Sequence, residues 1–211
     1  MNYWIFLLQI FIALIITIVI HEAGHLVASL LCGVKVNAFS IGFGKPALRR
    51  KWKGIIWQIT PWLIGGYTAI EGENSKVPNG FLVQSYIKKM IIVLSGVAVN
   101  FLLVLICHYL IFNKITYSSL KGVLSMWQPI MYSTSTGIVF FLLRLELYNL
   151  VIGIINLIPI PPLDGSYVWM LGLEKIMSEE AYKITSAILK AVGLIIVTLL
   201  QLAFVYYIWN I

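Results

Sequence analysis

Four long apolar stretches constrain this chain more than any other feature, because each is long enough to cross a lipid bilayer. A membrane-spanning helix needs roughly 20 apolar residues to cross about 30 Å of hydrocarbon. Hydrophobic residues make up 60% of the chain and charged residues 11%, against roughly 45–50% and about 25% in an average soluble domain. We therefore predict an all-α polytopic membrane protein with about four transmembrane helices, which form a single core over residues 1–211. The stretches run from Tyr3 to Leu31, from about Met90 to Phe112, from about Gly137 to Ile158 and from about Ala187 to Trp209.

Two points along this pattern are less regular. Arg144 and Glu146 interrupt the third stretch, and we expect them to snorkel or cap near the outer membrane surface, with contact to a partner as the alternative. They are two residues apart, so they do not face each other on a helix. Residues 125–136, just before this stretch, form either an extra membrane or interfacial helix or a loop, and the sequence leaves both readings open.

Positive charge concentrates between the first two stretches. Only Lys114 and Lys121 lie in the connection after the second stretch. By the positive-inside rule the first connection is cytoplasmic, and both termini then face outward. The net charge of +7 is accordingly a topology signal, with contact to anionic lipid as a secondary effect, and we predict no nucleic-acid partner. The cations of the first connection are Lys35, Lys45, Arg49, Arg50, Lys51, Lys53, Lys76, Lys88 and Lys89.

The connection from about residue 34 to residue 73 reads as β structure. Three segments are rich in β-branched and aromatic residues and are separated by glycine and proline: Val36–Phe43, Ile55–Thr60 and Gly66–Ile70. We predict a small membrane-associated β-hairpin element. Because irregular backbone at membrane depth must pack on protein or line a watery cavity, this element borders a wet pocket. A plain amphipathic hairpin on the surface is the alternative.

The strongest local motif is His21-Glu22-Ala23-Gly24-His25 at the end of the first stretch. Two histidines four residues apart share one face of a helix, so both imidazoles can bind one tetrahedral metal ion. Glu22 lies beside such an ion without ligating it, where a carboxylate can act as a general base. Ionisable groups inside a membrane are costly, which makes them functional candidates.

A catalytic zinc site needs a third protein ligand, and Asp164 is the candidate. It is the only aspartate in the chain and follows the proline-rich exit of the third stretch. The prolines break the helix and can turn Asp164 toward the histidines. The topology agrees, because the first and third stretches both end on the cytoplasmic side. The alternative is that Asp164 caps a helix N-terminus.

These motifs resemble the site-2 protease family of intramembrane zinc metalloproteases. The resemblance rests on His21-Glu22-x-x-His25 and on Asn156-x-x-Pro-x-Pro-x-x-Asp164-Gly165, and it covers most of the chain. The segments 41–44, 65–67 and 95–100 are also similar to the family's β region and second core helix. No PDZ domain stands between the second and third stretches, so we expect a minimal form of the family.

The resemblance implies that His21, His25 and Asp164 bind one Zn²⁺ per chain and that Glu22 is the catalytic base. It implies a bacterial cytoplasmic membrane, a membrane-spanning protein or peptide as substrate, and possible regulation by another membrane protein. Rival functions are a non-catalytic zinc-binding regulator or scaffold and a metal transporter. Further residues are expected to bind substrate or support the transition state, although the two asparagines can equally hold helices together: Asn100, Asn156, Gly65, Gly66 and Tyr67.

Overall fold

The computed structural model describes residues 3–113, 122, 130 and 133–209. Within them, four helices are long and apolar enough to cross a membrane, as expected from the sequence. They are α1 (Tyr3–Leu31), α2 (Tyr86–Phe112), α5 (Ile138–Asn156) and the part of α7 (Glu179–Trp209) that runs from Glu179 to Leu200. Most of residues 125–136 lie outside the described part of the chain, so the two readings of that segment stay predictions.

Two helices begin earlier than their apolar stretches. α2 begins at Tyr86 because the Ser85 hydroxyl caps it by accepting a hydrogen bond from the Lys88 amide at 3.5 Å. α7 begins at Glu179, with two acidic residues in its first turn, where the helix dipole favours negative charge. A short helix, α6 (Tyr167–Ile176), lies between the third and fourth spans and was not expected from the sequence.

The predicted small β element is present, and it is a mixed sheet rather than a single hairpin. It forms a four-stranded sheet in the order β2-β3-β1-β4. The sequence analysis missed β2, because its side chains are mostly cationic and all are exposed. The pairing of β1 with β3 is parallel, which a simple hairpin cannot produce. The strands are β1 (Val36–Phe43), β2 (Leu48–Trp52), β3 (Ile55–Ile59) and β4 (Trp62–Ile70).

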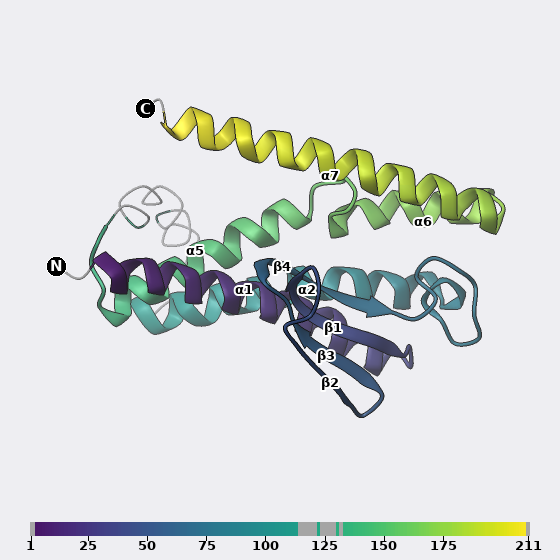
Figure 1. The fold of residues 1–211 in the computed structure, drawn as a ribbon, viewed down its shortest axis with the longest axis horizontal. Helices are drawn as coiled ribbons and strands as arrows, with labels where there is room; N and C mark the ends of the chain where they lie inside the picture. Colours follow the sequence, from purple (N-terminus) through teal and green to yellow (C-terminus); the bar gives the residue numbers. More distant parts are fainter. Residues whose placement is uncertain (1–2, 114–121, 123–129, 131–132, 210–211) are drawn as a thin grey trace.

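The sheet rests on the C-terminal half of α1 and leaves β4 at one edge. Leu26 of α1 forms an apolar cluster with Val36, Phe39 and Ile55 from the strands. Figure 1 shows the sheet projecting from the flank of α1, while α7 runs along the other side of the molecule beside α6. β4 pairs only with β1, so its other edge is free of any described strand.

The third span does not send Arg144 and Glu146 to the membrane surface, and that expectation is wrong. Both side chains are fully buried. Arg144 donates hydrogen bonds to the Gln9 side chain at 2.9 Å and to the Ser135 carbonyl at 3.0 Å. Glu146 contacts His108 Nδ1 on α2 at 2.6 Å. Both charged side chains thus face polar partners inside the bundle, as is expected of charges within a membrane span.

Candidate metal centre

Two imidazoles project from one face of α1 toward α2. The four-residue spacing of His21 and His25 brings their Nε2 atoms to 3.2 Å, with the rings almost perpendicular. Both side chains are about one tenth exposed. The two rings therefore present adjacent nitrogen atoms to a single point inside the bundle.

Asp164 joins the two histidines from a distant part of the sequence. α5 ends at Asn156, and the proline-containing segment after it turns the chain so that Asp164 opens a single 3-10 turn, η2 (Asp164–Ser166). Asp164 Oδ2 lies 3.3 Å from His21 Nε2 and 3.3 Å from His25 Nε2. Among the described residues, this is the one group of three such side chains that could hold a metal ion.

A face of α2 fixes the orientation of both imidazoles. Ile92, Gly96 and Asn100 follow one another at four-residue spacing, so they line one side of the helix. His25 Nδ1 lies 2.8 Å from the Ile92 carbonyl oxygen, and His21 Nδ1 lies 2.8 Å from Asn100 Oδ1. A carbonyl oxygen can only accept, so His25 carries a proton on Nδ1, and Nε2 is the ring nitrogen that faces the other two donors.

His21 also carries a proton on Nδ1, as the hydrogen bonds of two buried amide side chains, Asn149 and Asn100, indicate. Asn149 Nδ2 donates to the Leu145 carbonyl at 2.8 Å, which fixes the orientation of the Asn149 amide. Asn149 Oδ1 then accepts from Asn100 Nδ2 at 2.9 Å, so Asn100 Oδ1 must face His21. His21 therefore donates through Nδ1, and its Nε2 is the ring nitrogen that faces Asp164. Such hydrogen bonds are what orients a histidine toward a metal.

The three inward atoms fit a zinc ion. Two imidazole nitrogens and a carboxylate oxygen converge on one point inside the bundle. Three atoms bound at ~2.0–2.1 Å in tetrahedral directions lie roughly 3.3–3.4 Å apart, and the observed separations are 3.2–3.3 Å. Two nitrogens and one oxygen are a donor set that zinc accepts.

The Asp164 carboxylate is ionised, as a metal ligand must be. Burial raises the pKa of Asp164, but its contacts with His21 and His25 outweigh burial and bring the pKa below its usual range. Nearby, burial and the charge of Glu73 raise the pKa of Tyr167 well above its usual value, so this phenol stays neutral. Tyr167 donates to Glu73, and Glu73 also accepts from Lys190 of α7 at 2.9 Å, which ties the segment after Asp164 to its surroundings.

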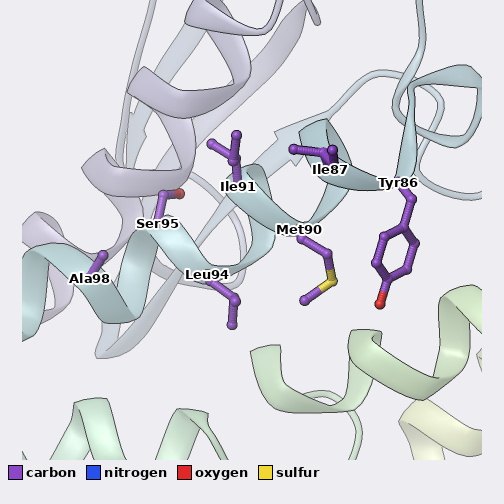
Figure 2. A pocket seen from close by; sticks show the side chains of 7 residues that line it. All are labelled: Tyr86, Ile87, Met90, Ile91, Leu94, Ser95 and Ala98. Atoms are coloured by element: carbon purple, nitrogen blue, oxygen red, sulfur yellow. The ribbon is translucent and has the colours of Figure 1, made fainter.

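Gly96 leaves the space that the two imidazoles occupy. A Cβ atom at this position would lie 2.4 Å from His25 Nε2 and 2.7 Å from His21 Cε1, closer than real Cβ atoms approach. The histidines thus pack directly on the backbone of α2. The open apolar groove on α2 in Figure 2 is lined by a neighbouring set of side chains and contains none of the three donors.

Glu22 lies between α1 and β4, next to the donor cluster in sequence but not part of it. Thr68 of β4 donates from Oγ1, which lies 3.0 Å from Glu22 Oε2 and 3.0 Å from the Glu22 carbonyl oxygen. A Cβ atom on Gly66 would lie 3.1 Å from Glu22 Cγ, so the glycine lets the strand approach the carboxylate. A held carboxylate beside a metal site can accept and release a proton.

The remaining predicted residues lie around this centre without touching the three donors. Asn156 donates to the Ile152 carbonyl of its own helix at 3.1 Å. Tyr67 accepts a hydrogen bond from Gln58 at 2.7 Å, and Gly65 packs against the Phe43 ring. Gly65, Gly66 and Tyr67 all belong to the edge strand β4. A role of these residues in substrate binding stays a prediction.

Sequence reasoning missed Asn149, Thr17 and Thr68. Asn149 donates to Thr17 Oγ1 at 2.9 Å and so joins α5 to α1 beside the metal donors. Thr17 precedes His21 by four residues, and Asn149 is an amide inside a membrane span. Both signals could have been used, because polar residues within a span are expected to face the interior of the bundle. Thr68 carries no comparable signal in the sequence.

Comparison with known proteins gives a consistent set of relatives. The family model of peptidase family M50 matches residues 9–114 and 108–200. A protein of Neisseria meningitidis described as a candidate zinc metalloprotease is 38% identical over 113 residues, 51% of this chain and 25% of its own length. The regulator of sigma E protease of Haemophilus influenzae is 32% identical over 108 residues, 48% of this chain and 24% of its own length. The chain thus spans about a quarter of the length of these curated relatives.

Proposed function

The chain belongs to peptidase family M50, and from this premise we propose that it is a zinc-dependent endopeptidase. It would hydrolyse a peptide bond within or beside the membrane. The family is the one that the resemblance to site-2 proteases predicted. The observation that carries the proposal is the convergence of His21 Nε2, His25 Nε2 and Asp164 Oδ2 next to Glu22. A metal site with three protein ligands and a neighbouring carboxylate is the arrangement of zinc hydrolases.

Each residue then has a defined task. His21, His25 and Asp164 would hold the ion. When bound, zinc supplies a Lewis acid that polarises the peptide carbonyl and makes water more acidic. Glu22 takes the proton from the attacking water and delivers it to the leaving amine. Asn100 and Ile92 hold the two imidazoles in the tautomer that leaves Nε2 free.

The substrate is proposed to be a membrane-spanning or membrane-proximal protein or peptide. A peptide bond inside a helix is shielded by its own hydrogen bonds, so the helix must unwind before cleavage. β4 lies beside α1 (Figure 1), contacts Glu22 through Thr68, and has an edge from Gly65 to Ile70 that pairs with no described strand. An extended substrate that pairs with this edge gains backbone hydrogen bonds next to the metal donors. Asn156 is proposed to contact the same backbone.

The site is proposed to open toward the cytoplasm of a bacterial cell. The cationic connection between α1 and α2 adjoins the C-terminal end of α1, and the positive-inside rule assigns that end to the cytoplasmic side. Both chain termini then face outward. The exposed cations of β2 would lie near the anionic lipid headgroups at this surface.

The rival function is a non-catalytic zinc-binding regulator or scaffold, and a single set of variants separates the two. Zinc content per chain is measured in detergent for the wild type and for His21→Ala, Asp164→Ala and Glu22→Gln, with His108→Gln as a histidine control. Cleavage is measured by mass spectrometry on single-span membrane peptides that carry glycine and proline in the span.

We expect about one zinc per chain in the wild type, the control and Glu22→Gln, and little zinc in the other two variants. Cleavage should be lost in Glu22→Gln although zinc is retained. Full biological activity of Glu22→Gln would favour the scaffold. A wild type without zinc, or Asp164→Ala with as much zinc as the wild type, would refute the ligand assignment.

A further inference from the structure

The contact between Thr68 and Glu22 joins the sheet to the catalytic carboxylate. Thr68 is about one tenth exposed and lies in the middle of β4, opposite Phe39 of β1. Its hydroxyl is within 3.0 Å of both Glu22 Oε2 and the Glu22 carbonyl oxygen. One hydroxyl carries one proton, so the two acceptors share it. The contact therefore fixes the side chain of Glu22 relative to its own backbone as well as to β4.

The alternation of β4 places this contact on the face that meets α1. Gly66 and Thr68 point to the same side of the strand because they are two residues apart, and both lie against Glu22. Tyr67, between them, points to the opposite side and bonds to Gln58 of β3. A short segment of one strand thus contacts the carboxylate on one face, while its outer edge remains free.

We propose that Thr68 is a positioning residue that orients Glu22 for proton transfer and couples the position of β4 to the carboxylate. This inference rests on the proposed function. A carboxylate that accepts a hydrogen bond from a fixed hydroxyl samples fewer orientations, so more of its collisions with the attacking water have the reactive geometry. Because β4 is also the proposed pairing edge, a substrate that orders the strand orders the base at the same time.

The experiment replaces the hydroxyl while keeping the shape of the side chain. Thr68→Val removes the donor, and Thr68→Ser restores it. Thr60→Val is the matched control, because Thr60 is a buried threonine of the same β region whose hydroxyl donates to the Ile41 carbonyl at 3.2 Å and not to Glu22. The measurements are kcat, KM, zinc content and thermal stability, with the single-span peptide that the wild type cleaves.

We expect Thr68→Val to lower kcat by about 10–100-fold, the range for loss of a hydrogen bond to a charged group. KM and zinc content should stay within about twofold of the wild-type values, and Thr68→Ser should recover most of kcat.

Several results would overturn the inference. One is a wild-type kcat in Thr68→Val, and another is a rise in KM alone, which would make Thr68 a substrate contact. An equal loss in Thr60→Val would indicate general damage to the sheet. If Thr68→Val does not fold, the pair Thr68→Ser and Thr68→Ala isolates the hydroxyl, and equal kcat in the two would refute the proposal. A wild type that cleaves no peptide would instead refute the proposed function itself, which is a separate result.

Discussion

Substitution of Gly96 by alanine tests whether the packing of α2 against the imidazoles builds the metal site. The added Cβ would lie 2.4 Å from His25 Nε2, whereas ordinary contacts of this kind begin at 3.4 Å. Relief of the contact requires a displacement of about 1 Å, while metal–ligand distances tolerate about 0.2 Å. A shift of α2 away from α1 would relieve the clash, but it would also lengthen the hydrogen bonds that orient both histidines.

We therefore expect Gly96→Ala to bind zinc at least ~100-fold more weakly than the wild type. The assay is titration of the purified protein with a chromophoric chelator, followed by elemental analysis for zinc. Helix propensity works in the opposite direction, since alanine in place of glycine stabilises a helix interior by roughly 0.5–1 kcal/mol. A loss of zinc without loss of helical content would thus identify the clash as the cause.

Gly172→Ala is the control for this substitution. Gly172 lies in the helix α6, and a Cβ there would meet nothing within 4 Å. This variant should keep its zinc and its thermal stability. The reasoning is refuted if Gly96→Ala retains wild-type zinc affinity, because the donors would then not depend on close contact with the α2 backbone.

Three further predictions concern buried contacts around the site. Asn149→Ala should weaken zinc binding by about 10–100-fold in the same chelator titration, because it frees the amide that orients a ligand; unchanged affinity would contradict this. Glu146→Ala should destabilise the protein by about 3–5 kcal/mol in reversible unfolding, because it breaks the buried pair of Glu146 and His108, whereas a change below about 1 kcal/mol would refute a stabilising pair. Burial raises the pKa of Glu174, but its bonds to Lys89 and a second lysine outweigh burial and lower it below 4.5. Its contribution to stability is therefore present above pH 4.5 and lost as the pH falls toward the folded pKa, so the difference in melting temperature between wild type and Glu174→Gln should shrink on acidification.

The spans and the two histidines of the candidate metal site could be found in the sequence because their signals are local. A run of about 20 apolar residues identifies a span without reference to the rest of the chain. The pair His21 and His25 needs only the pitch of a helix to share a face. Asp164 was found by its rarity and by the prolines before it, and topology brought the exit of the third span to the same side as the histidines.

The sheet was less predictable because its pairing is not local. β2 consists mainly of cations with exposed side chains, so it lacks the alternation that identifies a half-buried strand. The parallel pairing of Ala38 with Ile56 joins strands that are separated by β2, and no turn sequence specifies it. Arg144 was assigned to the surface for a related reason: its partners Gln9 and Ser135 come from other parts of the chain.

Asn149 and Thr17, which lie beside the site, escaped prediction, because in a membrane span no polar face marks the inner side of a helix by contrast. The helices contact one another along stripes of four-residue spacing, such as Ile92, Gly96 and Asn100 on α2. In a soluble helix the surrounding polar residues would reveal such a stripe, but here the lipid-facing side is as apolar as the rest. Only polar atoms distinguish the inner face, and their meaning depends on pairing, as when Asn100 meets Asn149 from another helix. The two histidines can therefore be read from one helix, whereas the groups that orient them require the assembled bundle.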